Sequence, residues 1–254
     1  VTWGENNKGG DSSGISLSNV VAIYSNLASF AALKDGGSVV TWGDSANGGD
    51  SSSVSSSISS GVTAICATWN AFAAITTGGG VVSWGSSNEV FSTTSSVSNS
   101  ISSGVKAIYS TRHAFAAVKS SGAVYCWGPS ENGGDCSSSS LSLSNGVVSI
   151  ASNEYAFAAL KSDGSVVAWG YSSAGGSVTQ GSGGDLTSGV IKIYSTKGAF
   201  GALKSDKSVI TWGNQYGGNS AALALTNVVS LSNTEYSMAA LTTEKKVITW
   251  GDQI

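Results

Sequence analysis

Residue types that perform catalysis are scarce in this chain, so we first asked whether those present are spaced for chemistry. His113 is the single histidine, and a Ser-His-Asp triad would have to use it as the general base. Gly10 to Gly14 reads GDSSG and matches the G-x-S-x-G pattern of a serine nucleophile. In a chain this rich in serine such a match is expected by chance, and no strand-to-helix turn surrounds it. These residues predict a protein that is not an enzyme.

Metal and cofactor sites are not predicted either. Cys66, Cys126 and Cys136 lack the spacing of metal ligands. The recurrent Gly-Gly-Asp loops lack the nonapeptide period of calcium-binding repeats, so we expect them to form turns. Cys66 stands where other copies of the repeat have Tyr, and we expect a small buried thiol there. Cys126 and Cys136 flank one loop and would pair only in an oxidising compartment.

Residue types that dominate protein–protein binding energy occur in six three-residue segments, which we call the triplets. The triplets are residues 26–28, 68–70, 111–113, 153–155, 196–198 and 234–236. Each triplet begins with Asn or Thr, whereas its second and third residues change from copy to copy. Because their flanks stay nearly constant, we expect these two positions to be free of packing duties. They form either a recognition surface, which we favour, or an idle solvated one. The predicted partner-binding residues are Leu27, Trp69, Asn70, Arg112, His113, Glu154, Tyr155, Lys197, Glu235 and Tyr236.

The elements that must position the triplets belong to one repeat, clearest in residues 105–128 (VKAIYSTRHAFAAVKSSGAVYCWG). Six copies end on Trp-Gly, at Trp42, Trp84, Trp127, Trp169, Trp212 and Trp250, and a further Trp-Gly stands at Trp3. Successive pairs are 38 to 43 residues apart. Self-similarity at a period of this size indicates a repeat architecture.

Each copy predicts four short antiparallel strands. The first strand reads like VVAIYS and the second like SFAAL, with the triplet between them. A Lys-x-Asp-Gly turn, as at Lys161 to Gly164, leads to a third strand ending on Trp-Gly. A polar loop and a serine-rich segment follow. Its apolar residues alternate, as at Ile15 and Leu17, which suits a half-exposed fourth strand.

Sheets with two apolar faces are buried by stacking around an axis, so we predict an all-β fold, a β-propeller of four-stranded antiparallel blades. Residues 1–254 would form a single propeller domain. Its six repeats would close as six blades or be part of a seven-bladed ring. The triplets and the loops after each third strand would share one face, and the hairpins the other. The Gly after each Trp would mark a bulge or a close backbone approach.

The consensus G-V-x-x-I-x-x-x-x-x-A-F-A-A-L-K-x-D-G-S-V-x-x-W-G-x-x-x-x-G-G-D resembles the repeat of the regulator of chromosome condensation family. It is closer still to the β-lactamase inhibitor protein II type of propeller. The resemblance covers nearly the whole chain, and the Gly-Gly-Asp loop at Gly48 to Asp50 is part of it. The third copy departs from it, with Glu89, Val90 and Phe91 where Gly-Gly-Asp is expected. The resemblance implies the propeller fold and a habit of binding proteins, but neither exchange-factor activity nor enzyme inhibition.

The composition of the chain limits the classes of partner that we expect. Charged residues make up 11% of the chain and the formal net charge is −3, which gives no basic field for nucleic acid. No apolar run is long enough for a membrane span. The expected partner is therefore another protein or copies of the chain itself, with a glycan as a further alternative.

Two alternative functions stay open beside protein binding. One is a structural or assembly module excised from a longer extracellular or scaffold array, since the chain begins at Val1 without Met. The other, weaker one is a glycan-binding propeller that uses Trp69, Tyr155 and Tyr236. No motif specifies the compartment, and we favour an extracellular or secreted location.

Overall fold

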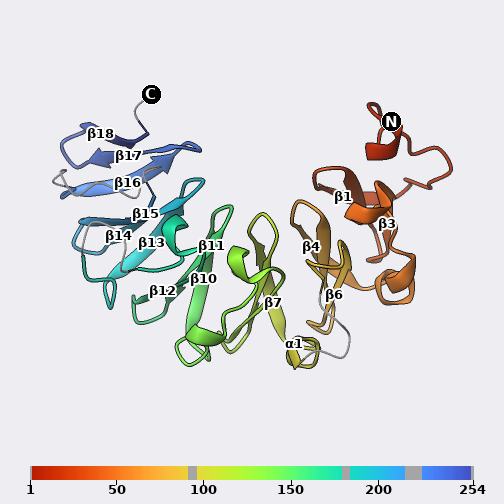
Figure 1. Ribbon diagram of the computed structural model, residues 1–254, viewed down its shortest axis with the longest axis horizontal. Helices are drawn as coiled ribbons and strands as arrows, with labels where there is room; N and C mark the ends of the chain where they lie inside the picture. Colours follow the sequence, from red (N-terminus) through yellow and green to blue (C-terminus); the bar gives the residue numbers. More distant parts are fainter. Residues whose placement is uncertain (1, 91–95, 179–183, 215–224, 253–254) are drawn as a thin grey trace. The chain divides into compact units, whose positions relative to one another are not determined.

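The computed structural model describes residues 2–90, 96–178, 184–214 and 225–252, whose strands form six antiparallel sheets (Figure 1). Each sheet has three strands in chain order. The strands are β1 (Val20–Ser25), β2 (Ser29–Lys34), β3 (Val39–Gly43), β4 (Val62–Ala67), β5 (Ala71–Thr76), β6 (Val81–Gly85), β7 (Val105–Ser110), β8 (Phe115–Lys119), β9 (Val124–Trp127), β10 (Val147–Ser152), β11 (Ala156–Lys161), β12 (Val166–Gly170), β13 (Val190–Ser195), β14 (Ala199–Lys204), β15 (Val209–Gly213), β16 (Val228–Asn233), β17 (Ser237–Thr242) and β18 (Val247–Gly251). The predicted all-β, blade-like repeats are confirmed.

The chain divides into two compact units. The N-terminal unit is Val1–Ser120 with Tyr125–Pro129, and the C-terminal unit is Ser121–Val124 with Ser130–Ile254. The sheets β1–β3 and β4–β6 belong to the first unit, and those from β10 to β18 belong to the second. A single domain over all 254 residues and the number of blades in a ring stay predictions.

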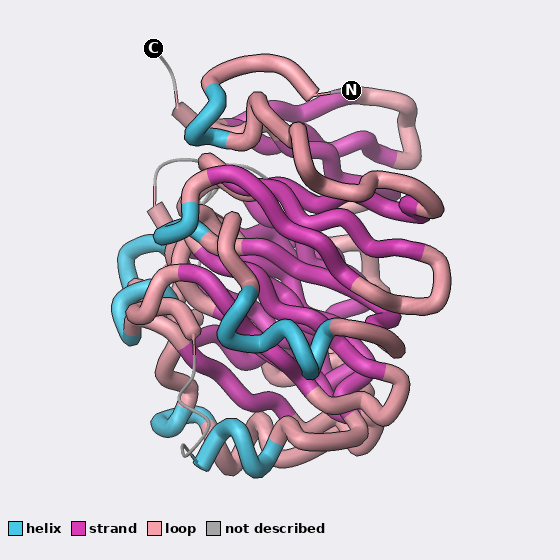
Figure 2. Tube along the Cα trace, turned by 90° about the vertical axis from the view of Figure 1, so that its right-hand side faces the viewer, coloured by secondary structure: helices cyan, strands magenta, loops and turns pink. Residues whose placement is uncertain are grey.

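Short helices, not a fourth strand, occupy the connections between sheets in the described residues (Figure 2). The helices are η1 (Asn6–Lys8), η2 (Ser45–Asn47), η3 (Ser52–Ile58), α1 (Ser96–Ser100), η4 (Ser130–Asn132), η5 (Ser137–Ser139) and η6 (Ser172–Ala174). The blade of four strands is therefore not confirmed. Serine side chains bond nearby carbonyls, as Ser59 Oγ does with Ser56 O at 2.9 Å, and such local bonds compete with a strand ladder.

In the described residues, four connections bury an apolar residue whose carbonyl accepts a bond from the third strand of the sheet before, namely Ile101, Leu143, Leu186 and Leu225. Ile101 is fully buried, and its carbonyl accepts a hydrogen bond from Val81 N at 3.0 Å. Leu186 likewise accepts from Val166 N at 2.9 Å. These segments close the outer edge of a sheet with one bond where a full strand was expected.

Each sheet has a loop end and a hairpin end, as the sequence predicts. At the loop end, Asn26 Nδ2 donates to Asn47 O at 2.6 Å, which joins a triplet to the loop after β3. At the hairpin end, Val62 N donates to Gly37 O at 2.9 Å, which joins the β2–β3 turn to the segment entering β4. The Gly after Trp also marks a close approach. At Gly43, φ is +107° and a Cβ would lie 2.5 Å from Ala28 O.

Neighbouring sheets are joined by a Phe–Trp pair and a glycine loop. Phe72 of β5 stacks on Trp84 of β6 with ring centroids 5.4 Å apart, and both are buried. Trp84 Nε1 donates to Gly48 O, in the loop of the preceding sheet, at 3.1 Å. The same indole-to-glycine bond recurs at Trp42, Trp169 and Trp212. Each of these four tryptophans thus packs between its own sheet and the loop before that sheet.

Cys126 and Cys136 are disulfide-bonded, a pairing that the sequence left open. Cys66 is free and half-buried, where a buried thiol was expected. Burial raises the pKa of the Cys66 thiol, whose Sγ lies 3.4 Å from Ser110 Oγ. Within the described segments, no helix is long and apolar enough to cross a membrane.

The glycine loop predicts a specific stability effect. At Gly48, φ is +92° and a Cβ would lie 2.8 Å from the buried ring of Phe72. Gly48→Ala should therefore lower the free energy of unfolding, measured in urea by tryptophan fluorescence, through both backbone strain and overpacking.

Gly14→Ala is the matched control. Its φ is +85°, yet a Cβ at this position would have no atom within 4 Å. We expect Gly48→Ala to cost about 1–3 kcal/mol more than Gly14→Ala. Equal losses in the two variants would show that contact with the Phe–Trp pair is not the constraint.

Candidate functional site

The first residue of each triplet has a structural role, which explains why it is restricted to Asn and Thr. Thr68 Oγ1 accepts a hydrogen bond from Ala71 N at 3.0 Å. Asn153 Oδ1 accepts from Ala156 N at 2.8 Å. Such side-chain-to-backbone bonds close the turn between the first and second strands.

The second residues of successive triplets lie side by side because backbone hydrogen bonds connect them. The two rows are Leu27–Trp69–Arg112 in the N-terminal unit and Glu154–Lys197–Glu235 in the C-terminal unit. In each case the N–H of one residue donates to the carbonyl of the next, at 3.2 and 2.9 Å in the first row and 3.4 and 2.8 Å in the second. The bonds use only backbone atoms, so they hold any side chain in the row.

Five predicted residues form what we call the Trp69 cluster: Leu27, Trp69, Asn70, Arg112 and His113. The Arg112 guanidinium lies over the Trp69 indole, with Cζ 3.4 Å from the ring centroid. The His113 ring meets the same indole edge-on at 6.0 Å. Trp69 is still 38% exposed and Leu27 is 63% exposed. The cluster therefore presents a fixed aromatic and cationic surface with apolar area left to bury.

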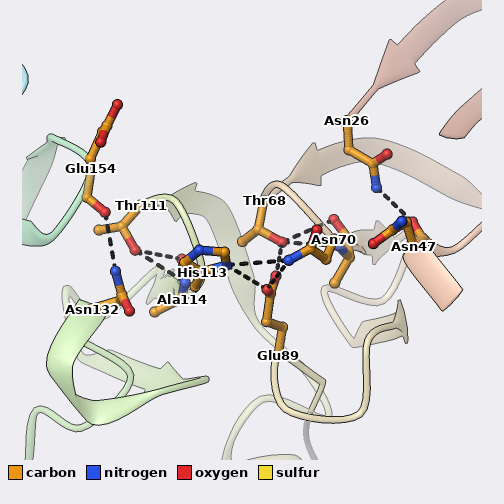
Figure 3. A network of polar contacts seen from close by, with 11 residues as sticks. Asn26, Asn47, Thr68, Asn70, Glu89, Thr111, His113, Ala114, Asn132 and Glu154 are labelled. Carbon is orange, nitrogen blue, oxygen red and sulfur yellow. Dashed lines mark hydrogen bonds and ion pairs between the residues drawn. The ribbon is translucent and has the colours of Figure 1, made fainter. Parts of the chain in front are cut away.

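A buried carboxylate holds the cluster from below (Figure 3). Glu89, 2% exposed, accepts from the Thr68 hydroxyl and, at 2.9 Å, from Asn70 Nδ2. His113 Nδ1 lies 2.7 Å from Glu89 Oε1. A carboxylate only accepts, so the proton of this bond is on Nδ1. Three side chains from two triplets thus converge on one acid.

The sequence reasoning missed Glu89 as a site residue. It follows β6 in the third copy, where Gly-Gly-Asp was expected, and this departure was the available signal. Val90 packs against the apolar cluster that includes Phe115 and Trp127. Phe91, the third residue of that departure, lies outside the described residues.

The C-terminal unit contains a second group, the Lys197 cluster, formed by Glu154, Lys197, Glu235 and Tyr236. Lys197 Nζ donates to Glu235 Oε1 at 2.8 Å and lies 3.6 Å from Glu154 Oε1. It also contacts the Tyr236 hydroxyl at 3.4 Å and lies 5.3 Å from the ring centroid. The bond to Glu235, then that to Tyr236, raises the pKa of Lys197. The hydrogen bond from Lys197, and after it the bond with Tyr236, lowers the pKa of Glu235.

Tyr155, the remaining predicted residue, pairs with an aromatic residue that the sequence reasoning did not single out. Its ring lies 6.3 Å from that of Tyr171, which follows Gly170 and is 53% exposed. Aromatic residues do not occupy this place in the other copies, and that was the only signal. Nine of the ten predicted residues therefore form two groups, one in each unit, and Tyr155 pairs with Tyr171.

The described residues do not assemble a catalytic or metal centre of the kinds considered. His113 Nδ1 donates to Glu89 and lies 3.4 Å from Asn70 Nδ2, and no serine joins this contact. No group of three or more His, Cys, Asp or Glu in the described ranges could hold a metal ion. The Gly-Gly-Asp carboxylates form turns, since Asp50 Oδ1 accepts from Ser52 N at 2.8 Å. That backbone bond lowers the pKa of Asp50.

Comparison with known proteins identifies the fold. No protein-family profile matches the chain, and no curated protein matches it in sequence. Among solved structures, the ectodomain of the receptor kinase CR4 from Physcomitrella patens aligns with a TM-score of 0.52 and 19% identity over 92% of this chain. Prp20p, the yeast RCC1, aligns with a TM-score of 0.52 and 16% identity over 91% of this chain and 72% of its own. Human WBSCR16 gives 0.51 and 14%, over 91% of this chain and 76% of its own.

These similarities support a fold like that of the regulator of chromosome condensation propellers, and at such identities they show the fold alone. The closer likeness to the β-lactamase inhibitor protein II type is not confirmed. The chain spans 61% of the length of the CR4 ectodomain structure.

Glu89 predicts a large stability effect for one acidic residue. Glu89→Ala should lower the free energy of unfolding by about 3 kcal/mol, because buried Thr68 and half-buried Asn70 and His113 lose their acceptor. Urea unfolding measures it. Glu5→Ala is the control, since the Glu5 side chain is 59% exposed beside Lys8 and should change stability by less than about 0.5 kcal/mol. Similar values for both variants would contradict the role given to Glu89.

The Lys197 cluster predicts a pH effect with a definite sign. The folded pKa of Glu235 is lowered, so its ion pair stabilises the fold above the unfolded pKa and is lost as pH falls below about 4.5. In Lys197→Met the pKa of Glu235, followed by carboxyl NMR, should rise towards its ordinary value, because the bond from Tyr236 remains. Lys192→Met, on the neighbouring strand, should leave it lowered. An unchanged pKa of Glu235 in Lys197→Met would refute the pairing.

Proposed function

We propose that this chain is a non-enzymatic, protein-binding repeat protein and that the loop ends of its sheets dock the partner. The observation that carries the proposal is the row of second triplet residues. Backbone hydrogen bonds hold Leu27, Trp69 and Arg112 side by side, and these bonds do not depend on the identity of the side chains. Such a scaffold separates the residues that maintain the fold from those that choose a partner.

The Trp69 cluster has the chemistry of a binding centre. Tryptophan and arginine are enriched among residues that dominate interface energy. Here the guanidinium–indole stack and the Glu89 network fix the orientations of Arg112, Asn70 and His113 before any partner arrives. Side chains that are already ordered lose little conformational entropy on binding. Exposed Leu27 supplies adjacent apolar area.

The fold gives independent support. Prp20p, which has this fold, was described with its binding properties to Gsp1p and histones. That statement concerns Prp20p, and the residues that would bind a partner in this chain are argued only from the Trp69 and Lys197 clusters. We propose the Trp69 cluster as the centre of the docking surface, because Lys197, the cation of the Lys197 cluster, is already paired with Glu154 and Glu235.

A capture experiment tests the proposal. Wild-type protein and the variant Trp69→Ala/Arg112→Ala would be immobilised and exposed to an extract of the source organism with brief chemical cross-linking. Quantitative mass spectrometry should find at least one protein that the wild type captures and the variant loses by about tenfold or more. Circular dichroism would verify that the variant is folded.

The control is Trp3→Ala/Lys106→Ala, which removes an 85% exposed Trp and an exposed cation outside the triplets. It should capture the same protein as the wild type. Identical captures by all three proteins would refute the proposal. Binding to a glycan array that is lost with Trp69→Ala would replace a protein partner with a glycan.

A further inference from the structure

Three Asn-Gly pairs occur in the chain, and the structure gives them different surroundings. They are Asn47-Gly48, Asn132-Gly133 and Asn145-Gly146. An asparagine loses its side-chain amide most readily when glycine follows, because glycine has no side chain to keep its backbone nitrogen away from the amide carbon. The sequence alone does not distinguish the three pairs, so the difference between them must come from the fold.

Two of the pairs belong to glycine loops that precede a sheet. Asn47 ends η2 and Asn132 ends η4. The glycines that follow, Gly48 and Gly133, are buried so close to a Phe ring that a Cβ would lie 2.8 and 2.7 Å from it. In the second pair the side chain is anchored as well, since Asn132 Nδ2 donates to Glu154 O at 3.3 Å. The glycine nitrogen is therefore enclosed in both pairs.

The third pair lies at the hairpin end, in a segment that is neither helix nor strand. Asn145 is exposed, and its Nδ2 donates to the neighbouring Ser144 Oγ at 3.4 Å. Gly146 N donates to Ser121 O at 3.5 Å. Both distances are near the upper limit for a hydrogen bond, so these bonds restrain the pair weakly. All four residues belong to the C-terminal unit.

The repeat does not require an asparagine at this position. In the other five copies, the residue two places before the first strand is Ser or Thr, namely Ser18, Ser60, Ser103, Ser188 and Thr226. The residue after it has a positive φ in every copy, and at Gly146 this angle is +75°. Only this copy combines an asparagine with a glycine there.

We propose that Asn145 is a site of spontaneous covalent modification, deamidation through a cyclic imide. Gly146 N attacks Asn145 Cγ, and the new N–Cγ bond replaces the Cγ–Nδ2 bond. The amide leaves as ammonia and takes the proton that Gly146 N loses. Water then opens the ring at one of its two carbonyls. Opening at Cγ gives aspartate, and opening at the main-chain carbonyl gives isoaspartate, in which the main chain runs through the former side chain.

The reaction changes the segment that enters β10. Ser162 N donates to Gly146 O at 2.8 Å and Val147 N donates to Gly122 O at 3.2 Å, so this segment is bonded to the turns on both sides. Either product adds a carboxylate, and isoaspartate also lengthens the main chain next to these bonds. The modified protein should therefore be less stable. The triplets lie at the loop end, so the proposed docking surface is not touched.

Peptide mapping by mass spectrometry tests the proposal on the full chain, kept for weeks in neutral buffer. In the folded protein, conversion at Asn145 should be about tenfold or more faster than at Asn47 and Asn132, since the restraint of about one hydrogen bond changes a rate by roughly this factor. In protein unfolded by urea, the three pairs should convert at comparable rates, because the fold no longer separates them.

Asn145→Ser is the matched variant, since serine is the residue of most other copies at this position. Fresh Asn145→Ser should unfold in urea as fresh wild type does. After storage the wild type should unfold at lower urea concentration, whereas the variant should change less. Equal conversion of the three pairs in the folded protein would overturn the proposal. So would a preference for Asn145 that persists in urea, or equal loss of stability by the two stored proteins.

Discussion

The arrangement of the sheets depends on a buried indole N–H that must find an acceptor. An indole without a partner in an apolar interior would cost about 1–3 kcal/mol. In four described cases the acceptor is a glycine carbonyl from the loop before the sheet, at 3.0 or 3.1 Å. In these four cases the bond ties a sheet to the loop that precedes it. It also explains the glycine, since the loop approaches a buried Phe ring too closely for a Cβ.

The loop after β6 shows how the same place in the repeat serves a different purpose. Val90 packs in the apolar cluster around Phe115 and Trp127, so the loop retains a packing contribution without Gly-Gly-Asp. Glu89 then enters the loop end as a buried acid. Burying a carboxylate is unfavourable unless it is fully hydrogen-bonded, and Thr68, Asn70 and His113 supply those bonds. The loop that departs from the repeat is therefore the loop that fixes side chains of two triplets.

Most of the fold could be predicted from the sequence because its signals are local and repeated six times. The first strand VVAIYS coincides with β1, and the Trp-Gly ends coincide with the ends of the third strands in five of six copies. The short helices that stand where a fourth strand was expected could not be predicted, since alternating apolar residues do not reveal that serine hydroxyls bond nearby carbonyls.

The candidate site could be predicted only in part. Variable triplet columns identified the Trp69 and Lys197 clusters, but the stack of Arg112 on Trp69 depends on residues 43 positions apart in the chain. Glu89 and Tyr171 were missed because each lies in a loop that the repeat pattern marks only as polar. Their contacts form only when the loop meets a triplet in space, as when Glu89, after β6, bonds His113 of the next sheet.

In the triplets, structural bonds use the backbone and the first residue, which leaves the second and third side chains for the recognition role that we propose. Backbone N–H and C=O groups join the second triplet residues, and the first residue closes the turn, so neither task constrains the second and third side chains. Substitution there costs little folding energy, which is why Leu27, Trp69 and Arg112 can follow one another. A merely solvated row would need no buried acid beneath it. Glu89 stabilises fixed positions of Asn70 and His113, and the docking surface that we propose requires this order.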